Sequence, residues 1–332
     1  MSSPGAPADN HPVPLIIDTD TAQDDCIAIL VGLLDPGAEL LAITMVAGNV
    51  GFEQQVANAQ LTLNVAGMLG RVPVHAGCRR PLLREWVSAT EVHGDGSGGL
   101  SMESQAAVVD DEHAVDALLR ITAERPGEVS IVAIGPLTNI ATAAVLDRGF
   151  AARVKSLYVM GGSNNGRGNI TASAEYNFYV DPEAAQIVME AGFADLRLIT
   201  WDPLTLRDAT ISRTDFDRLG AIDTPMARFF HRMCAATIDY DESVGIDGST
   251  HPDSLTIAAL LHPELVLAEA PYRVDVETAS ELTRGYSAMA WDKFGVAPNA
   301  TVVEAVDAAA FFGLLEDLLG TGTEPTVPIS GL

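Results

Sequence analysis

The sequence predicts a single α/β domain with a mainly parallel central sheet flanked by helices, an open Rossmann-like arrangement. Five short apolar runs lack polar alternation, as strands buried on both faces of a parallel sheet do; they lie at 14–17, 40–47, 129–134, 154–160 and 196–200. Helical patterns separate these runs, and strand–helix alternation is typical of βαβ units. The chain has 332 residues, 48% of them hydrophobic, so one domain can bury a sizeable core.

The helices can be placed in chain order. Helical patterns follow the first two strands, as CIAILVGLL and at 53–69, and another at 113–124 precedes the third strand. Asp181-Pro182 predicts a further helix start, since Asp is a good N-cap and Pro suits the first helical position. Region 203–250 is rich in charged and aromatic residues, and we expect helices and a flap beside a pocket there.

The N-terminus is expected to be a lead-in rather than part of the domain. Its first 12 residues contain Pro and small polar residues, without a basic flank or an apolar core, so they do not resemble a signal peptide. We expect residues 1–12 to be disordered and the domain to span 13–332.

The charge balance excludes several classes of partner. Lys and Arg total 19 against 45 Asp and Glu, a formal net charge of −26. Binding to nucleic acid or to an anionic membrane needs basic residues, so neither is expected. The three cysteines, Cys26, Cys78 and Cys234, form no CxxC pair and indicate a reduced, cytoplasmic setting. We therefore expect a small-molecule substrate.

Polar residues follow each predicted strand. Asp18 to Asp25 follow the first, Gly48-Asn49 the second, 135–139 the third, 161–165 the fourth and Trp201-Asp202 the fifth. Ligands of open α/β sheets bind at the carboxyl ends of the strands. These loops are therefore expected to converge on one site.

The most unusual stretch is LIIDTDTAQDDC at 15–26, with Asp18, Asp20, Asp24 and Asp25 in eight positions. One of these carboxylates could simply cap the following helix. Four of them are better explained by a hard divalent cation, which cancels their mutual repulsion. An EF-hand loop starting at Asp18 fails, because Gln23 and Ile29 replace the required Gly and Glu. A haloacid-dehalogenase phosphatase motif fits poorly, since Ala22 occupies its fifth position.

The opening DTDTAQDDCIAIL resembles the DxDxxxDDxxA(I/L) motif of the nucleoside hydrolases, the inosine/uridine-preferring family. Further segments match in order: ITMVAGNV, EVHGDGSGG, AIGPLTNIA, YVMGG and, most specifically, GNITASAEYNFYVDPEAA. The resemblance extends from about residue 14 to about residue 295. It implies the open nucleoside hydrolase fold and hydrolysis of the N-glycosidic bond of ribonucleosides, giving free base and ribose, as in purine and pyrimidine salvage.

The resemblance also implies one Ca²⁺ and a set of residues around it. Asp20, Asp25 and Asp253 would be carboxylate ligands, and Ile134 would contribute its main-chain carbonyl. Asp20 would also be the general base: it would take a proton from a metal-bound water, and that water would attack an oxocarbenium-like ribose. The residues expected to hold the substrate are Asp24 at the 2′-hydroxyl, Asn49 and Asn177 at ribose hydroxyls, Asn169 and Glu175 at the 5′-hydroxyl, and Met160 under the sugar.

The sequence departs from the family pattern at two places. Thr21-Ala22 replaces the usual Pro-Gly, and Pro252 stands directly before Asp253 where histidine-using members have His. His251 and His93 are both candidates for protonating the leaving base, with Pro252 able to turn His251 elsewhere. Trp201, Trp86 or Tyr240 could instead stack on the base. The preferred base stays open.

Relatives are dimers or tetramers, so we expect a homodimer or homotetramer. Two alternatives to a common ribonucleoside hydrolase remain. The chain could hydrolyse an unusual or modified N-riboside, or it could bind a nucleoside or ribose without catalysis. The intact Asp20 and Asp25 argue against the second.

Overall fold

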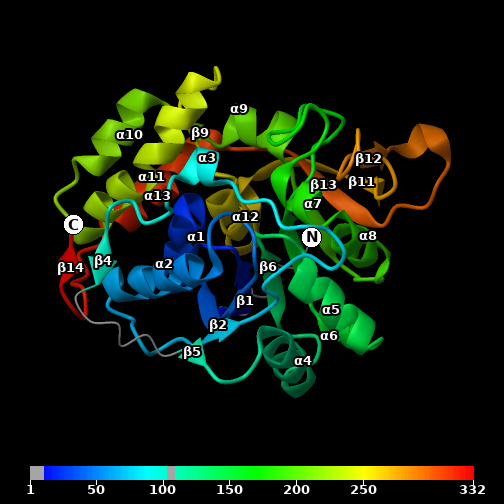
Figure 1. Ribbon diagram of the computed structural model, residues 1–332, viewed down its shortest axis with the longest axis horizontal. Helices are drawn as coiled ribbons and strands as arrows, with labels where there is room; N and C mark the ends of the chain where they lie inside the picture. Colours follow the sequence, from blue (N-terminus) through cyan, green and yellow to red (C-terminus); the bar gives the residue numbers. More distant parts are fainter. Residues whose placement is uncertain (1–10, 103–108) are drawn as a thin grey trace, which may run out of the picture.

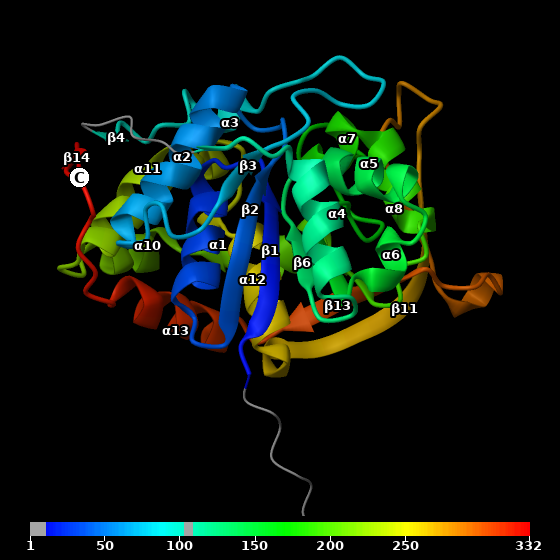
Figure 2. The same ribbon diagram turned by 90° about the horizontal axis from the view of Figure 1, so that it is seen from below.

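The computed structural model describes residues 11–102 and 109–332. A ten-stranded sheet forms the centre of the molecule, with helices on both of its faces (Figures 1 and 2). Its strands in chain order are β1 Val13–Thr19, β2 Ala38–Met45, β3 Val74–Ala76, β5 Val109–Asp110, β6 Ser130–Ala133, β7 Ser156–Met160, β8 Leu196–Ile199, β11 Val266–Val276, β12 Ser287–Ala290 and β13 Ala300–Val306. The α/β fold class with a mainly parallel sheet is confirmed.

The strand order places the first strand in the middle of the sheet. That order is β12-β11-β13-β8-β7-β6-β1-β2-β3-β5, and β1 pairs in parallel with both β2 and β6. The chain thus proceeds to one side from β1 to β2 and later returns on the other side at β6. Such a switch point leaves a crevice beyond the carboxyl ends of the strands, where ligands bind. Only β11 pairs antiparallel, with β12 and β13, at one edge of this ten-stranded sheet.

Helices cover both faces of the sheet and create two apolar cores. On one face lie α1 Gln23–Leu34, α2 Phe52–Val65, α11 Pro225–Ser243, α12 Pro252–Leu261 and α13 Ala308–Leu319. On the other lie α4 Ala114–Glu124, α5 Thr138–Leu146, α6 Phe150–Arg153 and α8 Pro182–Glu190, and Figure 2 shows the two groups on either side of β1 and β2. This double burial explains why the parallel strands read as continuous apolar runs.

The remaining elements are short and lie in the connections. The helices are α3 Thr90–His93, α7 Tyr176–Val180, α9 Leu206–Asp208 and α10 Arg213–Gly220, with a π-helical turn η1 Trp201–Thr205 and 3₁₀ turns η2 Pro263–Leu265 and η3 Asp292–Phe294. The short strands β4 Ser101–Met102 and β14 Ile329–Ser330 pair with each other, as do β9 Thr210–Ile211 and β10 Ser249–Thr250. No helix within residues 11–102 and 109–332 is long and apolar enough to cross a membrane.

All five predicted strands are present, and the predicted helices are present as well. Asp181 caps α8 by accepting a hydrogen bond from the Ala184 amide, with Pro182 at the first helical position, as expected. The 203–250 region forms α9, α10 and α11. The expected lead-in lies outside the described residues except for positions 11 and 12, so the domain boundary at 13 stays a prediction.

Candidate active site

A cavity of about 620 Å³ opens at the carboxyl ends of the central strands. Loops from five strands reach its wall, with Asp25 following β1, Asn49 following β2, Ile134 following β6, Met160 ending β7 and Trp201 following β8. The wall is completed by α3, α7, α11 and the start of α12. The predicted convergence of the strand-end loops is therefore what the structure has.

Asp20 and Asp25 are held together by Asn49. Oδ2 of Asp20 accepts a 2.9 Å hydrogen bond from the Asn49 amide N–H, and Oδ2 of Asp25 accepts one of 3.2 Å from Asn49 Nδ2. Asp25 also accepts from Thr19 Oγ1 and from the Ala22 amide. Asp20 is fully buried, does not contribute to the cavity wall, and its Oδ1 has no hydrogen-bond partner among the described residues.

Burial makes the ionised forms of these carboxylates costly. It raises the pKa of Asp25 to about 6, and burial together with the charge of Asp25 raises the pKa of Asp20 well above its ordinary value. The pKa of Asp253 is also raised well above its ordinary value, first by burial and then by the charges of Asp25, Asp24 and Asp20. Three mutually repelling carboxylates at one place need a compensating positive charge to ionise together at neutral pH.

Two glycines make room for the Asp20 carboxylate. A Cβ built on Gly48 would lie 1.9 Å from Asp20 Oδ2, and one built on Gly135 would lie 2.8 Å from Oδ1. Both glycines follow strands, β2 and β6, that flank β1. Close approach of this backbone therefore fixes the position of Asp20.

Asp24 is turned away from its neighbours toward α12. Its Oδ2 accepts hydrogen bonds from the Asp253 and Ser254 amides, at 2.7 and 3.3 Å, and its Oδ1 accepts one of 2.5 Å from Ser254 Oγ. A carboxylate is well placed at the N-terminus of a helix, where free N–H groups and the helix dipole favour it. Asp24 thus joins the first aspartate loop to the helix that carries Asp253.

The other residues expected to hold ribose also line the cavity. Asn177 Nδ2 donates to the carbonyls of Ile134 and Met160, at 3.0 and 3.1 Å. Glu175 accepts hydrogen bonds from the Gly162, Asn177 and Phe178 amides, while burial raises its pKa to about 7. Asn169 accepts from the Tyr176 amide. The structure brings all these predicted residues to the cavity wall.

His93 reaches the cavity from α3, and a glutamine lies behind it. Its Nδ1 contacts Oε1 of Gln23, whose Nε2 donates a 3.1 Å hydrogen bond to the His93 carbonyl. Burial lowers the pKa of His93 to about 4. Gln23 received no role in the sequence analysis; its position between the aspartates was a signal, but its partners are distant in the chain.

His251 lies outside the cavity wall. Its ring is buried and stacked on Phe230, with ring centroids 5.6 Å apart, and Nδ1 lies 2.9 Å from Asp24 Oδ1. Its Nε2 has no hydrogen-bond partner among the described residues. In this arrangement His251 supports Asp24, and a role as acid for the leaving group would require the ring to move.

The aromatic candidates for stacking differ in position. Trp201 and Tyr240 both belong to the cavity wall. Trp86 instead donates from Nε1 to the Gly48 carbonyl at 2.8 Å and is not part of that wall. Of the three, Trp201 and Tyr240 therefore remain available to a nucleobase.

The residues around Asp20 fit a hard divalent cation. Carboxylates of Asp20, Asp25 and Asp253, together with the Ile134 carbonyl, form the all-oxygen donor set that Ca²⁺ prefers, and the partnerless Oδ1 of Asp20 is a buried atom that a cation would satisfy. The oxygens of these three carboxylates do not all lie within 4.8 Å of one another, unlike the ligand atoms of a second cluster among the described residues. No hydrogen bond from the described residues fixes the Asp253 carboxylate, so its side chain can adjust.

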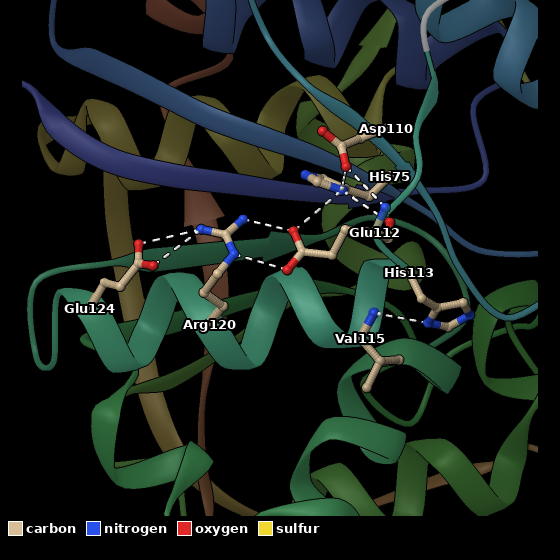
Figure 3. A network of polar contacts seen from close by, with 7 residues as sticks. All are labelled: His75, Asp110, Glu112, His113, Val115, Arg120 and Glu124. Atoms are coloured by element: carbon tan, nitrogen blue, oxygen red, sulfur yellow. Dashed lines mark hydrogen bonds and ion pairs between the residues drawn. The ribbon is translucent and has the colours of Figure 1, made fainter.

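That other cluster consists of His75, Asp110 and Glu112, whose ligand atoms all lie within 4.8 Å of one another (Figure 3). Both Glu112 oxygens already accept hydrogen bonds from Arg120, and His75 Nδ1 lies 3.1 Å from the Glu112 carbonyl. These contacts tie β3 and β5 to α4, and none of the three residues belongs to the cavity wall. We interpret the cluster as an ion-pair network of the sheet edge.

Comparisons with known proteins agree with this site. The family described as inosine-uridine preferring nucleoside hydrolase matches residues 15–313. An uncharacterised protein of Schizosaccharomyces pombe is 37% identical over 92% of this chain and 98% of its own. The pyrimidine-specific ribonucleoside hydrolase RihA of Salmonella newport is 34% identical over the same shares, 92% and 98%.

Solved structures show the same fold. The plant nucleoside hydrolase PpNRh1 superposes with a TM-score of 0.82 at 30% identity, covering 93% of this chain and 99% of that one. A purine-preferring ribonucleoside hydrolase of Gardnerella vaginalis superposes with a TM-score of 0.84 at 26% identity, covering 92% and 98%. With its strand-end carboxylates, its cavity and these relatives, the chain belongs to the inosine-uridine preferring nucleoside hydrolase family and is a ribonucleoside N-glycosidase.

Proposed function

We propose that the protein is a Ca²⁺-dependent hydrolase that cleaves the N-glycosidic bond of ribonucleosides to give free base and ribose. The observation that supports the cation is the buried Asp20 carboxylate. One of its oxygens has no hydrogen-bond partner in the described part of the chain, and two further carboxylates with raised pKa values lie nearby. Asp20, Asp25, Asp253 and the Ile134 carbonyl would hold the ion. When bound, Ca²⁺ would orient ribose hydroxyls and acidify a coordinated water.

Asp20 acts as the general base in this proposal. It takes the proton of the attacking water, and Gly48, Gly135 and the Asn49 amide keep its carboxylate in place. A general base accepts a proton only in its ionised form, and a bound cation would lower the raised pKa of Asp20.

The other wall residues bind the ribose and stabilise its positive charge. The ribose hydroxyls form hydrogen bonds with Asn49, Asn177 and Asp24. Both Asp24 oxygens also accept hydrogen bonds from the start of α12. Glu175 and Asn169 hold the 5′-hydroxyl, and Met160 packs under the sugar. Carboxylates and amide oxygens aimed at the ring favour an oxocarbenium-like transition state over the neutral substrate.

The base preference is a separate proposal. RihA is described as pyrimidine-specific and the Gardnerella vaginalis protein as purine-preferring, so relatives of this chain differ in the base they prefer. Trp201 and Tyr240 would stack on the base, with His93 near its edge. His251 stays a candidate acid only if its ring leaves Asp24. Hydrolysis of an unusual or modified N-riboside is the alternative. Non-catalytic binding, which the Pro252 replacement motivates, ranks below it.

Release of free ribose from a substrate panel tests this proposal. The panel contains inosine, adenosine, guanosine, uridine, cytidine and p-nitrophenyl riboside, each with and without chelator. We expect release that a chelator abolishes and Ca²⁺ restores. Cleavage of p-nitrophenyl riboside alone would indicate an unusual natural base, and ribose binding without any release would support the binding-protein alternative. A cytoplasmic homodimer or homotetramer remains our expectation, and sedimentation measures the oligomeric state.

A further inference from the structure

Gln23 contacts two elements of the cavity wall, α3 and α11. Its side chain is buried and does not itself line the cavity. Nε2 donates to the His93 carbonyl at 3.1 Å, while Oε1 contacts His93 Nδ1 and accepts a 2.9 Å hydrogen bond from Thr237 Oγ1 of α11. One amide therefore touches α3 at both its backbone and its side chain, and α11 as well.

These contacts determine which ring nitrogen of His93 carries the proton. A backbone carbonyl can only accept, so the Gln23 atom facing it must be the NH₂ group, and the atom facing Nδ1 must be the oxygen. An oxygen acceptor requires Nδ1 to be the protonated nitrogen. In the neutral ring Nε2 then carries a lone pair.

The other edge of the ring is left to the cavity. His93 belongs to the cavity wall, and its Nδ1 edge is turned to Gln23. No hydrogen bond from the described residues reaches Nε2. This nitrogen is nevertheless not a fully buried atom, so it is accessible from the cavity. Burial lowers the pKa of this ring to about 4, so the ring is neutral near pH 7 and Nε2 is an acceptor there.

We propose that Gln23 is a positioning residue that fixes the Nδ1-protonated tautomer of His93, so that Nε2 faces the nucleobase as a hydrogen-bond acceptor. The inference rests on the proposed function and deepens it. It adds a specificity-determining contact: a base with an N–H donor on the edge that meets His93 would be preferred to the same base with that nitrogen methylated. It also means that resting His93 does not donate a proton to the leaving base.

The tautomer can be measured without activity. In protein labelled with ¹⁵N-histidine, long-range ¹H–¹⁵N correlation distinguishes a protonated nitrogen from one with a lone pair, and the His93→Ala variant assigns the signals. We expect Nδ1 to be protonated in the wild type and the two tautomers to mix in Gln23→Met, which keeps the length of the side chain. Thr237→Val is the matched control, because it removes the other contact of Oε1 and should leave the tautomer unchanged. An Nε2-protonated wild type would overturn the proposal.

Kinetics test the acceptor role. We compare kcat/KM for uridine with 3-methyluridine and for inosine with 1-methylinosine, where methylation removes the N–H donor. The parent nucleosides should be preferred by the wild type, and Gln23→Met should reduce that preference by about fivefold, the value of one neutral hydrogen bond. The space available to the added methyl group is the same in wild type and Gln23→Met, because Gln23 does not line the cavity. An unchanged preference would refute the role of Gln23.

Failure of the proposed function gives a different result. If the wild type releases no ribose from any nucleoside or from p-nitrophenyl riboside, the hydrolase assignment fails. If it cleaves p-nitrophenyl riboside and the parent nucleosides but ignores methylation, the hydrolase assignment stands and the acceptor assignment falls. Thermal unfolding of Gln23→Met identifies a misfolded variant, and in that case the wild-type tautomer decides alone.

Discussion

Nδ1 of His251 lies 2.9 Å from Oδ1 of Asp24, and both side chains are buried. The same carboxylate accepts hydrogen bonds from the amides at the start of α12, including that of Asp253. His251 is therefore attached to the support of a proposed cation ligand, and Pro252 rather than His251 reaches the cavity wall. His251 could either protonate the leaving base or support Asp24, and the contact with Asp24 favours support.

Replacing His251 by alanine should affect good and poor leaving groups equally. An acid for the leaving base would matter for inosine and little for p-nitrophenyl riboside, whereas a supporting residue acts on both. The buried Asp24 carboxylate would lose a partner, at a cost of about 1–3 kcal/mol in the free energy of unfolding. Ribose release from both substrates, with chemical denaturation, measures these effects. A loss confined to inosine would restore His251 as the acid.

Gly48→Ala should abolish activity while Gly51→Ala should not. The new Cβ at position 48 would overlap Asp20 Oδ2, 1.9 Å away, so the carboxylate must move. At Gly51, on the same loop, a Cβ meets nothing within 4 Å, which makes it a matched control. Ribose release and Ca²⁺ titration calorimetry measure the two variants. Equal activity in both would show that the position of Asp20 is not critical.

Asp20→Asn should lower kcat by roughly 10³-fold, the usual contribution of a general base. Asp18→Asn is the control from the same cluster. Asp18 is buried, its pKa is raised by burial to about 7, and its Oδ1 bonds Thr44 and Asn139 away from the cavity. We expect Asp18→Asn to retain turnover. Activity of Asp20→Asn near the wild-type level would remove Asp20 as the base.

Ca²⁺ should raise the thermal midpoint, and more so at pH 8 than at pH 6. The pKa values of Asp20, Asp25 and Asp253 are raised, so each carboxylate holds a proton at lower pH and must release it to bind a cation. Binding to the folded state alone stabilises it. Differential scanning calorimetry with and without Ca²⁺ measures the gain, and Asp253→Asn should reduce it. A gain that is independent of pH would argue against these ligands.

Glu175 should make the protein less stable as the pH rises. Burial raises its pKa from 4.5 to about 7 in the folded state, so folding takes up a proton between these values. Its stabilising contribution is complete below pH 4.5 and is lost as the pH rises through 7. Between pH 5.5 and 8.0 the free energy of unfolding should therefore fall by about 2 kcal/mol more in wild type than in Glu175→Gln. Urea denaturation of the two chelator-treated proteins at each pH measures this difference. If the free energy of unfolding depends on pH in the same way in both proteins, the prediction is wrong.

The sequence predicted the central sheet because its strands are buried on both faces and read as apolar runs. The strands toward both edges of the sheet were not predicted. β3 Val74–Ala76 is too short to show a pattern, and much of β11 Val266–Val276 is exposed, so neither reads as a buried strand. Helix starts were predictable where a cap is local, as at Asp181.

The residues that line the site were largely predictable, but the roles that depend on contacts between distant residues were not. Strand-end loops and family motifs placed the cavity residues. The partners of Gln23 and of His251 lie far away in the chain, at His93 and Asp24, and no local pattern encodes such pairs. Side-chain roles that depend on these contacts therefore required coordinates.

The central place of β1 has a consequence for synthesis on the ribosome. β1 is synthesised first, but all elements from α1 to α4 separate it from its partner β6. Asp24 likewise lacks its hydrogen-bond partners until α12, Pro252–Leu261, has been synthesised. Non-local pairings form late because loop closure must precede them. A nascent chain therefore exposes its aspartates to water until the last helices emerge. Binding of the proposed cation would then follow the completion of folding rather than start it.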